Sequence, residues 1–324
     1  MKLNTLGEKE LISFIRKKFF VSKPNLIIGI GDDAAVIKAG RASFILTKDL
    51  LIENFHFSCD ICSPYLLGRK SLSVNLSDIA SVGGKPEYAL LGLGLPSHLE
   101  VNWVEEFFSG MNSVLKEQRM YLIGGDISQA EKITISITVV GRGKNIIKRG
   151  GAKPGHILCV SGTIGDAAQG LVLLKKKVKM GESKRMDPLL RAFLDPFPQI
   201  TLGRKLSSLN AASAMIDISD GLSIDLAHIC QESRCGAEIY IQKIPISSEL
   251  SYFQKNPYEM ALHGGEDYQL LFSIPPENIG LISGFKKKYR ITQIGRMIQR
   301  KSIYMINEQG RRKKLEPKGY QHFS

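Results

Sequence analysis

Cysteine is scarce in this 324-residue chain, which contains five. A small, odd number of cysteines forms no disulfide framework and is typical of a reducing compartment. Cys59 and Cys62 make a single Cys-x-x-Cys pair without a second pair or a histidine cluster, so we expect no zinc site. The N-terminus lacks an apolar signal core, and the longest apolar run, Tyr88 to Pro96, is too short to cross a bilayer. We therefore expect a cytoplasmic protein without a membrane partner.

The sequence also lacks the common nucleotide-binding motifs. Gly-x-x-x-x-Gly-Lys-Ser/Thr is not present, and Gly-x-Gly-x-x-Gly is missing where a dinucleotide fold needs it. The net charge is +13, but the basic runs at 175–177, 286–288 and 311–314 carry no interleaved aromatic residues. We interpret these runs as solvated faces that would still attract phosphorylated substrates. A nucleic-acid partner is not expected, and an RNA- or nucleotide-binding protein without catalysis remains the alternative that the charge alone suggests.

A recurring pattern places glycine and acidic residues after an apolar run. It is clearest where Asp32 and Asp33 follow Leu26–Ile28, and it recurs at 46–49, 122–126 and 215–221, with a helical form at 75–78. Adjacent carboxylates repel, so a buried pair requires a cation beside it or a turn that aims the two apart. We call each occurrence of this pattern an acidic corner. A single acidic corner is usually an exposed turn or a helix cap. Five in matching context predict a site for metal ions and anions.

The length and the hydrophobic pattern predict an α/β (α+β) chain with two domains that share a cleft. Helices are expected at about 8–20, from Pro64 to near Gly83, at 101–118 and at 221–235. Strands are expected at 44–46, 88–95 (buried), 120–123, 133–142, 156–161, 214–218, 268–274 and 291–297. The pattern changes in the glycine-rich, basic stretch 141–155. We therefore predict an N-terminal domain of residues 1–148 and a C-terminal domain of residues 149–324.

Oxygen ligands without a histidine cluster suit magnesium better than zinc. So many acids in one place require several divalent ions and polyanionic phosphates to neutralise them. Backbone N–H groups at Gly124 and Gly125 and after Asp220 could hold phosphate oxygens, and Arg149 could clamp one. The candidate metal ligands are Asp33, Thr47, Asp49, Asp78, Asp126, Asp217 and Asp220. If the protein uses ATP, it does so without a P-loop.

Taken in order, these motifs resemble the thiamine-monophosphate kinase family, and the match runs nearly end to end. The matching segments are 29–35, Asp49 with 56–57, 75–78, 124–126, 217–222, 264–268, 318–320 and 322–323. The wider superfamily includes aminoimidazole ribonucleotide synthetase, which shares some of the acidic corners. The Gly-Gly-Glu-Asp-Tyr element and the terminal Tyr320 favour the thiamine branch. Another ATP-dependent member of the superfamily is the nearest alternative.

The resemblance implies ATP-dependent phosphorylation of thiamine monophosphate to thiamine diphosphate, with several Mg²⁺ ions and no covalent nucleophile on the protein. It also implies a two-domain fold like that of aminoimidazole ribonucleotide synthetase. In that fold the N-terminal mixed sheet with its helices pairs with its mate in a homodimer, and a C-terminal α/β domain completes the cleft. The family's metal positions fall on Asp33, Thr47, Lys48, Asp49, Asp78, Asp126, Asp217 and Asp220. Its ATP positions fall on Gly125, Asp126, Arg149 and Ser219, and its substrate positions fall on His56, Glu266 and Tyr320.

Two residues depart from the family pattern. Asn54 replaces a glycine, which is tolerable because asparagine adopts a left-handed backbone comparatively often. Lys48 replaces a threonine at a metal position. If 44–49 is extended, Lys48 points away from Thr47 and Asp49, so that only its backbone carbonyl can serve a metal ion.

Some of these residues also have ordinary structural interpretations. His56 between two phenylalanines fits a core histidine, and Tyr320 fits an aromatic that pins the C-terminal tail. Asp32 is expected to support Asp33 rather than bind a metal ion itself, and Asp166 is expected to cap a helix.

Overall fold

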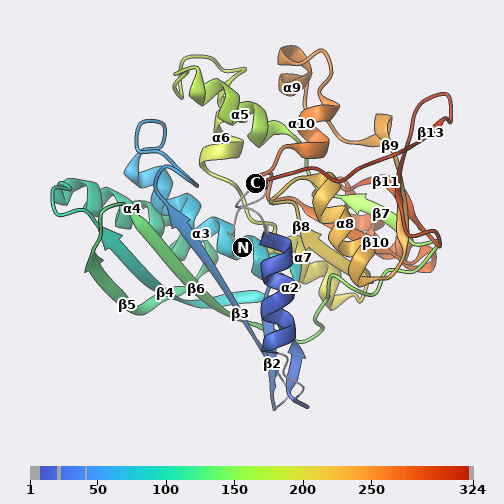
Figure 1. Ribbon diagram of the computed structural model, residues 1–324, viewed down its shortest axis with the longest axis horizontal. Helices are drawn as coiled ribbons and strands as arrows, with labels where there is room; N and C mark the ends of the chain where they lie inside the picture. Colours follow the sequence, from blue (N-terminus) through green and yellow to red (C-terminus); the bar gives the residue numbers. More distant parts are fainter. Residues whose placement is uncertain (1–7, 20–22, 41, 321–324) are drawn as a thin grey trace.

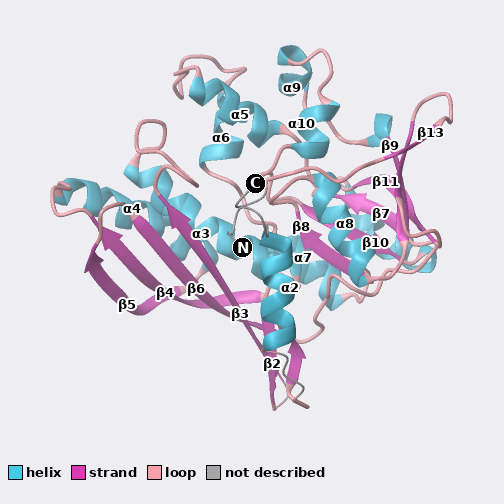
Figure 2. Ribbon diagram, in the orientation of Figure 1, coloured by secondary structure: helices cyan, strands magenta, loops and turns pink. Residues whose placement is uncertain are grey.

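The computed structural model describes residues 8–19, 23–40 and 42–320, and these form two mixed β-sheets with helices between and around them (Figure 1). The first half of the chain builds a six-stranded sheet and the second half a seven-stranded sheet. Figure 2 shows the two sheets on either side of the molecule, with α3 (Pro64–Ser81) and α7 (Ile200–Ser208) between them. The predicted two-domain α/β fold is confirmed. The predicted helix end at Phe20 and the motif residues His322 and Phe323 lie outside the described residues.

The first sheet has the strand order β1-β2-β3-β6-β4-β5. Its strands are β1 (Leu26–Ile28), β2 (Ala35–Ala39), β3 (Ala42–Ile52), β4 (Lys85–Leu95), β5 (Tyr121–Gln129) and β6 (Thr134–Gly143). Its helices are α2 (Glu8–Lys18), α3 and α4 (Val101–Gln118). Helix α3 packs on one face of the sheet and α4 packs against α3, and α3 also contacts β8 of the second sheet. Helix α3 is therefore the element that joins the two halves.

The sequence of α3 explains both its start and its close packing. Ser63 accepts a hydrogen bond from the backbone N–H of Leu66 at 3.3 Å, and Pro64 occupies the first helical position. Gly68 lets α4 approach closely, because a Cβ there would lie 2.0 Å from the carbonyl oxygen of Phe107. The helix can therefore lie pressed between the first sheet, α4 and α7, with most of its residues buried.

The second sheet has the order β13-β12-β9-β11-β7-β10-β8. Its strands are β7 (Ile157–Val160), β8 (Ala214–Asp217), β9 (Gly236–Tyr240), β10 (Leu270–Ile274), β11 (Thr292–Ile298), β12 (Ile303–Ile306) and β13 (Arg312–Lys314). The accompanying α-helices are α5 (Asp166–Lys175), α6 (Asp187–Leu194), α7, α8 (Leu222–Glu232), α9 (Ser248–Phe253), α10 (Tyr258–His263) and α11 (Ser283–Lys286). No helix among the described residues is long and apolar enough to cross a membrane.

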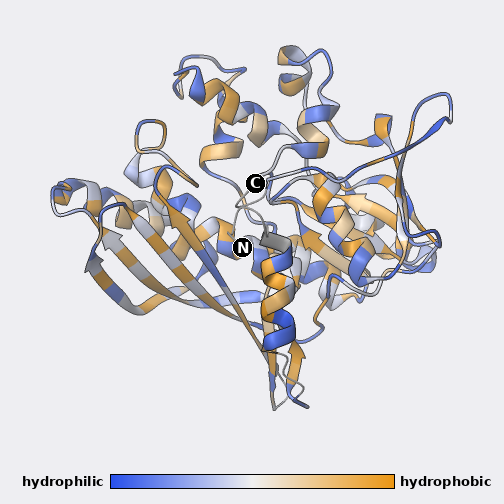
Figure 3. Cartoon of the chain, in the orientation of Figure 1, coloured by the Kyte–Doolittle hydropathy of each residue, from blue (hydrophilic) through white to orange (hydrophobic). Residues whose placement is uncertain are grey.

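One face of the first sheet is apolar yet exposed. Along β4, Leu91 and Leu93 are buried toward the helices, whereas Tyr88 and Leu90 are 37% and 40% exposed on the other face. Every residue of edge strand β5 is exposed. Figure 3 shows hydrophobic residues scattered along these strands. An apolar face of this kind usually marks an interaction surface, and the expectation that 88–95 is a buried strand is wrong because only one of its faces is covered.

Two of the predicted strand ends are also wrong. Strand β3 does not stop at Leu46 but continues to Ile52, and β5 does not stop at Ile123 but continues to Gln129. The pairing with neighbouring strands holds both segments extended: Asp49 pairs with Ile137 of β6, and Asp126 with Gly92 of β4. By contrast, β1 and β8 end directly before or at their acidic corners, as predicted.

Candidate active site

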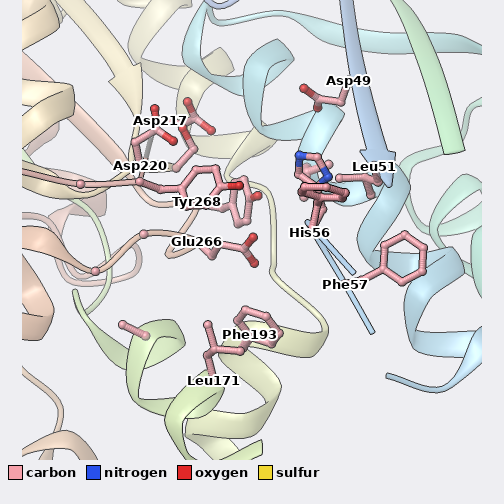
Figure 4. Close-up of a pocket in the computed structure, with 18 of the residues that line it drawn as sticks. Asp49, Leu51, His56, Phe57, Leu171, Phe193, Asp217, Asp220, Glu266 and Tyr268 are labelled. Carbon is pink, nitrogen blue, oxygen red and sulfur yellow. The ribbon is translucent and has the colours of Figure 1, made fainter. Parts of the chain in front are cut away.

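A cleft of about 960 Å³ lies between the two halves of the chain. Figure 4 shows Asp217, Asp220 and Glu266 on one side of it and Asp49 and His56 on the other. The sequence-predicted residues that line it are Lys48, Asp49, His56, Asp78, Asp217, Ser219, Asp220, Glu266 and Tyr320. Residues from both halves of the chain thus meet at one site.

Three aspartates from three different elements meet at one edge of this cleft. Asp33 lies in the turn after β1, Asp78 on α3 and Asp217 at the end of β8. One carboxylate oxygen from each lies within 4.8 Å of the others, and the hydroxyl of Thr47 donates a hydrogen bond to Asp78. The Oδ2 atoms of Asp33 and Asp217 are buried without a hydrogen-bond partner among the described residues. Buried carboxylate oxygens of this kind are stable only when they are protonated or next to a cation, and their hard-donor chemistry fits Mg²⁺.

The electrostatics of this cluster also call for a cation. Burial and the charge of Asp33 raise the pKa of Asp217 to about 8. The same two causes raise the pKa of Asp49 to about 6. Burial, together with the charges of Asp49 and Asp217, raises the pKa of Asp78 well above its ordinary value. Without a bound cation, these carboxyl groups therefore retain protons at a pH where free aspartates have lost them.

We predict that the metal-free protein loses stability as the pH rises from about 5 to 8. The folded-state pKa values of Asp49 and Asp217 lie above the ordinary value of 3.8, so the folded protein binds more protons and its free energy of unfolding falls across this interval. Magnesium should reverse the loss by neutralising the ionised cluster. Scanning calorimetry should show a Mg²⁺-induced rise in Tm that is at least about 2 °C larger at pH 8 than at pH 5.5. A Tm shift of equal size at both pH values would contradict the assignment of these acids to a metal site.

Asp32 and Arg149 hold the turn that carries Asp33. Asp32 Oδ1 accepts a hydrogen bond from the backbone N–H of Asp33 at 2.9 Å, and its Oδ2 accepts one from the backbone N–H of Arg149 at 3.1 Å. The guanidinium Nε of Arg149 donates to Asp33 Oδ1 at 3.0 Å. Both adjacent carboxylates therefore contact Arg149, Asp32 through its backbone N–H and Asp33 through its guanidinium group.

His56 is placed by a tight turn after β3. Asn54 has the left-handed backbone that we expected there, with φ of 66°. The Nδ1 atom of His56 accepts a hydrogen bond from the backbone N–H of Ile52 at 3.0 Å. Neutral His56 therefore carries its proton on Nε2, which makes that atom a donor. The ring is half-buried and lines the cleft, so the interpretation as a core histidine is wrong.

The segment 264–268 brings Glu266 into the cleft from the C-terminal half. Glu266 and Tyr268 both have left-handed backbones, with φ of 68° and 47°. Their backbone N–H groups donate to the carbonyls of Ser219 and Ile218 at 2.7 and 2.8 Å. These bonds tie the segment to the residues directly after β8. The Glu266 carboxylate forms an ion pair with Lys70 of α3.

Asp267 ties this segment to the start of α5. Its carboxylate accepts hydrogen bonds from the backbone N–H groups of Gly165 at 2.7 Å and Ala167 at 3.3 Å, so it caps α5. The expectation that Asp166 caps this helix is wrong, because the Asp166 carboxylate accepts hydrogen bonds from the hydroxyls of Thr163 and Ser247.

The C-terminal segment reaches the cleft beside Asp220. The backbone N–H of Tyr320 donates to the carbonyl of Asp220 at 3.2 Å, and Ser223 Oγ donates to the carbonyl of Lys318 at 2.7 Å. The tail is thus pinned to the start of α8, and the half-exposed Tyr320 ring lines the cleft. Tyr320 can therefore both pin the C-terminal tail and lie at the site.

Gly125 and Asp126 do not join the other residues within one chain. Asp126 pairs with Gly92, which alternates with the buried Leu91 and Leu93, so Asp126 lies on the exposed face of the sheet. Thr47 contacts α3 and therefore lies on the opposite face. Strands β6 and β4 separate β3 from β5, which amounts to roughly 14 Å across the sheet. The structure of a single chain therefore leaves Asp126 outside the acidic cluster.

Lys48 shows the alternation that an extended strand requires. It lies in β3 and is exposed, whereas Thr47 before it is buried against α3. The side chain of Lys48 therefore faces away from Asp78, although it lines the rim of the cleft.

We predict that Lys48→Thr changes turnover and the magnesium requirement by less than about threefold, under about 1 kcal/mol. The reason is that any contribution of this position to a metal ion comes from the backbone carbonyl, which both residues have. A magnesium titration of the initial rate checks the prediction. A marked fall in the magnesium concentration for half-maximal rate would show that the ammonium group does repel the ions.

Lys70 is a site residue that reasoning from the sequence missed. It is 3% exposed on α3 and pairs with Glu266 across the interface between the two halves. Its only signal in the sequence is a charge within a helix whose other residues are mostly apolar or small.

Comparisons with known proteins identify the family of this chain. The sequence pattern of the AIR synthase related protein family matches this chain twice: its N-terminal domain at residues 31–143 and its C-terminal domain at residues 153–307. The chain is 38% identical over 331 residues to thiamine-monophosphate kinase of Aquifex aeolicus, with 100% of both chains covered. It is 35% identical to that of Escherichia coli strain K12, with 98% of both covered. The two family matches and the two-domain fold thus define a member of the AIR synthase-related class.

Solved structures show the same relationship. A structure described as AaThiL complexed with AMPPCP and TMP superposes with a TM-score of 0.89 at 37% identity and covers 99% of both chains. The hydrogenase maturation protein HypE in complex with ATP shares the fold, with a TM-score of 0.69 at 16% identity, and covers 100% of this chain and 99% of that one. Within the AIR synthase-related class, the chain belongs to the thiamine-monophosphate kinase family.

Proposed function

We propose that this protein transfers the γ-phosphoryl group of ATP to thiamine monophosphate and so forms thiamine diphosphate and ADP. The observation that supports this most strongly is the cluster of Asp33, Asp78 and Asp217, with two unpartnered buried oxygens at the edge of a cleft. A relative that superposes over the whole chain is described as a complex with AMPPCP, an ATP analogue, and TMP. Phosphoryl transfer depends on positioning and charge neutralisation, and this cleft is built for both.

The metal end of the proposed site consists of hard oxygen donors. We assign Mg²⁺ binding to Asp33, Thr47, Lys48 through its carbonyl, Asp49, Asp78, Asp126, Asp217 and Asp220. When bound, the ions neutralise the phosphates and the charge that develops on the transferred group. The cluster itself holds its carboxylates in place through Thr47 and the turn at Asp32. This fixed geometry means that little reorganisation is needed at the moment of transfer.

The ATP end would use Arg149 and Ser219 together with Gly125 and Asp126. Arg149 already lies against Asp33, and Ser219 lines the cleft next to Asp217. On our proposal the guanidinium group leaves Asp33 and binds a phosphate oxygen once cations neutralise the aspartates of the cluster. Arg149 is suited to this because its planar fork can contact two phosphate oxygens.

The thiamine end would use His56, Glu266 and Tyr320. The Nε2–H of His56 can donate to a phosphate oxygen of the substrate, because Nδ1 is occupied by the backbone. Glu266 can accept from the amino group on the pyrimidine ring, and the half-exposed ring of Tyr320 can stack on the cationic thiazolium ring. Leu171 and Phe193 add an apolar wall to the same end of the cleft.

We also propose that the protein is a homodimer in which the exposed face of the first sheet packs against its mate. That face carries Leu50, Tyr88, Leu90 and alternate residues of the exposed edge strand β5, and burying it in a twofold interface would remove an exposed apolar patch. Asp126 lies on this face, too far from the acidic cluster of its own chain. The proposal therefore assigns Gly125 and Asp126 to the site of the partner subunit.

Two further assignments accompany this proposal. We place the domain boundary at residues 148 and 149, in the segment that links β6 to β7. We assign the protein to the cytoplasm, because the reaction consumes ATP and because Cys62, Cys159, Cys230 and Cys235 are buried as free thiols.

Measurement of ADP release from ATP and Mg²⁺ with and without thiamine monophosphate tests the proposed function. We expect release that depends on thiamine monophosphate. Release that depends instead on formylglycinamidine ribonucleotide would indicate an aminoimidazole ribonucleotide synthetase. ATP binding without turnover, with an affinity for RNA that falls steeply with salt, would indicate the non-catalytic alternative.

A further inference from the structure

Lys70 is a buried cation beside the end of the cleft to which we assign thiamine monophosphate. Its side chain is 4% exposed, and its ammonium group forms an ion pair with the carboxylate of Glu266. The same ammonium lies 3.5 Å from the centroid of the Phe193 ring. A lysine is rarely this buried, and the cost of desolvating it is recovered only when its partners are fixed. These contacts join three elements: α3, the segment 264–268 and α6.

Lys70 lies behind Glu266 as seen from the cleft. Glu266 lines the cleft, and its side chain is 30% exposed, whereas Lys70 is not among the lining residues. The ion pair uses Oε2 of Glu266. Glu266 also has a left-handed backbone, with φ of 68°, so its main chain is held in a conformation that few side chains favour. The direction of its carboxylate in the cleft therefore depends on Lys70.

We propose that Lys70 is a positioning residue that makes Glu266 a directed hydrogen-bond acceptor for the ring of the substrate. The inference rests on the proposed function and adds to it a role for a residue outside the family motif. Lys70 holds Oε2, which leaves Oε1 to accept from an N–H donor on the substrate. Because the Lys70–Glu266 pair is neutral as a whole, it recognises the amino group on the pyrimidine ring of the substrate and not the positive charge, which lies on the thiazolium ring. The faces of aromatic side chains such as Tyr320 are then the groups that recognise the positive charge.

Lys70→Met tests the role directly, because methionine keeps the length of the side chain and removes its charge. We expect KM for thiamine monophosphate to rise about tenfold, with KM for ATP and kcat each within about threefold of wild type. Lys70→Arg, which keeps the cation and can stack on Phe193, should recover most of the loss. Arg69→Met is the matched control. Arg69 is the adjacent residue of α3, but it pairs with Glu117 and Asp195, so its loss should lower stability and leave both KM values unchanged.

A second variant covers the case in which Lys70→Met leaves the Glu266 carboxylate without its ion-pair partner and fails to fold. The double variant Lys70→Met/Glu266→Gln removes both charges together. If Lys70 acts only through Glu266, the double variant should have the same KM for thiamine monophosphate as Glu266→Gln alone. A KM more than about threefold higher in the double variant would overturn the inference.

The wild-type measurements distinguish a failure of the proposed function from a failure of the proposed role of Lys70. A wild-type protein that releases no ADP in response to thiamine monophosphate overturns the proposed function. An active wild type whose KM for thiamine monophosphate is unchanged by Lys70→Met overturns the role of Lys70 alone. Equal rises in both KM values for Lys70→Met, or a fall in kcat alone, would mean a structural role and would likewise overturn it.

Discussion

Replacing Asp33 with asparagine should reduce kcat by about a hundredfold or more, which corresponds to a loss of about 3 kcal/mol of transition-state stabilisation. Asp33 is one of three aspartates whose oxygens converge within 4.8 Å, and its Oδ2 is buried without a hydrogen-bond partner among the described residues. The protein should still fold, because asparagine keeps an oxygen that accepts from Arg149 and removes one charge from a repelling cluster.

Two measurements check this expectation. Initial rates at saturating ATP and thiamine monophosphate give the loss in kcat, and calorimetric titration with Mg²⁺ should show weaker binding by the variant. Asp60→Asn serves as the control, because Asp60 is an exposed acid of the same domain outside the cleft lining. Near wild-type turnover in Asp33→Asn would mean that the acidic corner is only a turn.

A hybrid dimer built from two inactive chains should regain about half of the wild-type activity. Asp126→Asn should be as inactive as Asp33→Asn, because we assign both residues to the metal site. If Asp126 serves the site of the partner subunit, a hybrid of one Asp33→Asn chain and one Asp126→Asn chain contains one site with both aspartates intact and one with neither. Co-expression with two affinity tags isolates the hybrid, and its rate is compared with that of the wild-type dimer.

The matched control is a hybrid of Asp33→Asn with Asp217→Asn. These two aspartates belong to the same chain's cluster, so each site of this hybrid lacks one of them and no activity should return. If the hybrid of Asp33→Asn with Asp126→Asn stays inactive as well, the proposed contribution of Asp126 across the dimer is wrong.

The acidic corners at the ends of β1 and β8 were predictable from the sequence. An apolar run followed by glycine and acid is a local signal, and the structure places Asp33 and Asp217 where such a signal predicts them. The alternation of Thr47 and Lys48 was predictable for the same reason, because it follows from extended backbone alone. Local patterns therefore predicted the part of the site that lies at strand ends and along one strand.

The remaining features depend on tertiary contacts that no local pattern encodes. The run at Leu122–Asp126 resembles the other corners, but pairing with β4 keeps it extended and puts Asp126 on the open face of the sheet. Lys70 and Glu266 are 196 positions apart in the sequence, so nothing near either residue indicates their ion pair. Asp267 likewise caps a helix about 100 positions away. Such contacts become visible only when the two halves of the chain are packed together.

The measurement that tests the central claim most directly is a single turnover with ATP labelled at the γ-phosphate, thiamine monophosphate and Mg²⁺. The protein and the small-molecule products are separated and each is analysed for label and mass. Direct transfer predicts that the label appears in thiamine diphosphate, in step with ADP, and that no label is bound to the protein at any time. Label in inorganic phosphate alone, or on the protein before it reaches thiamine diphosphate, would contradict the account.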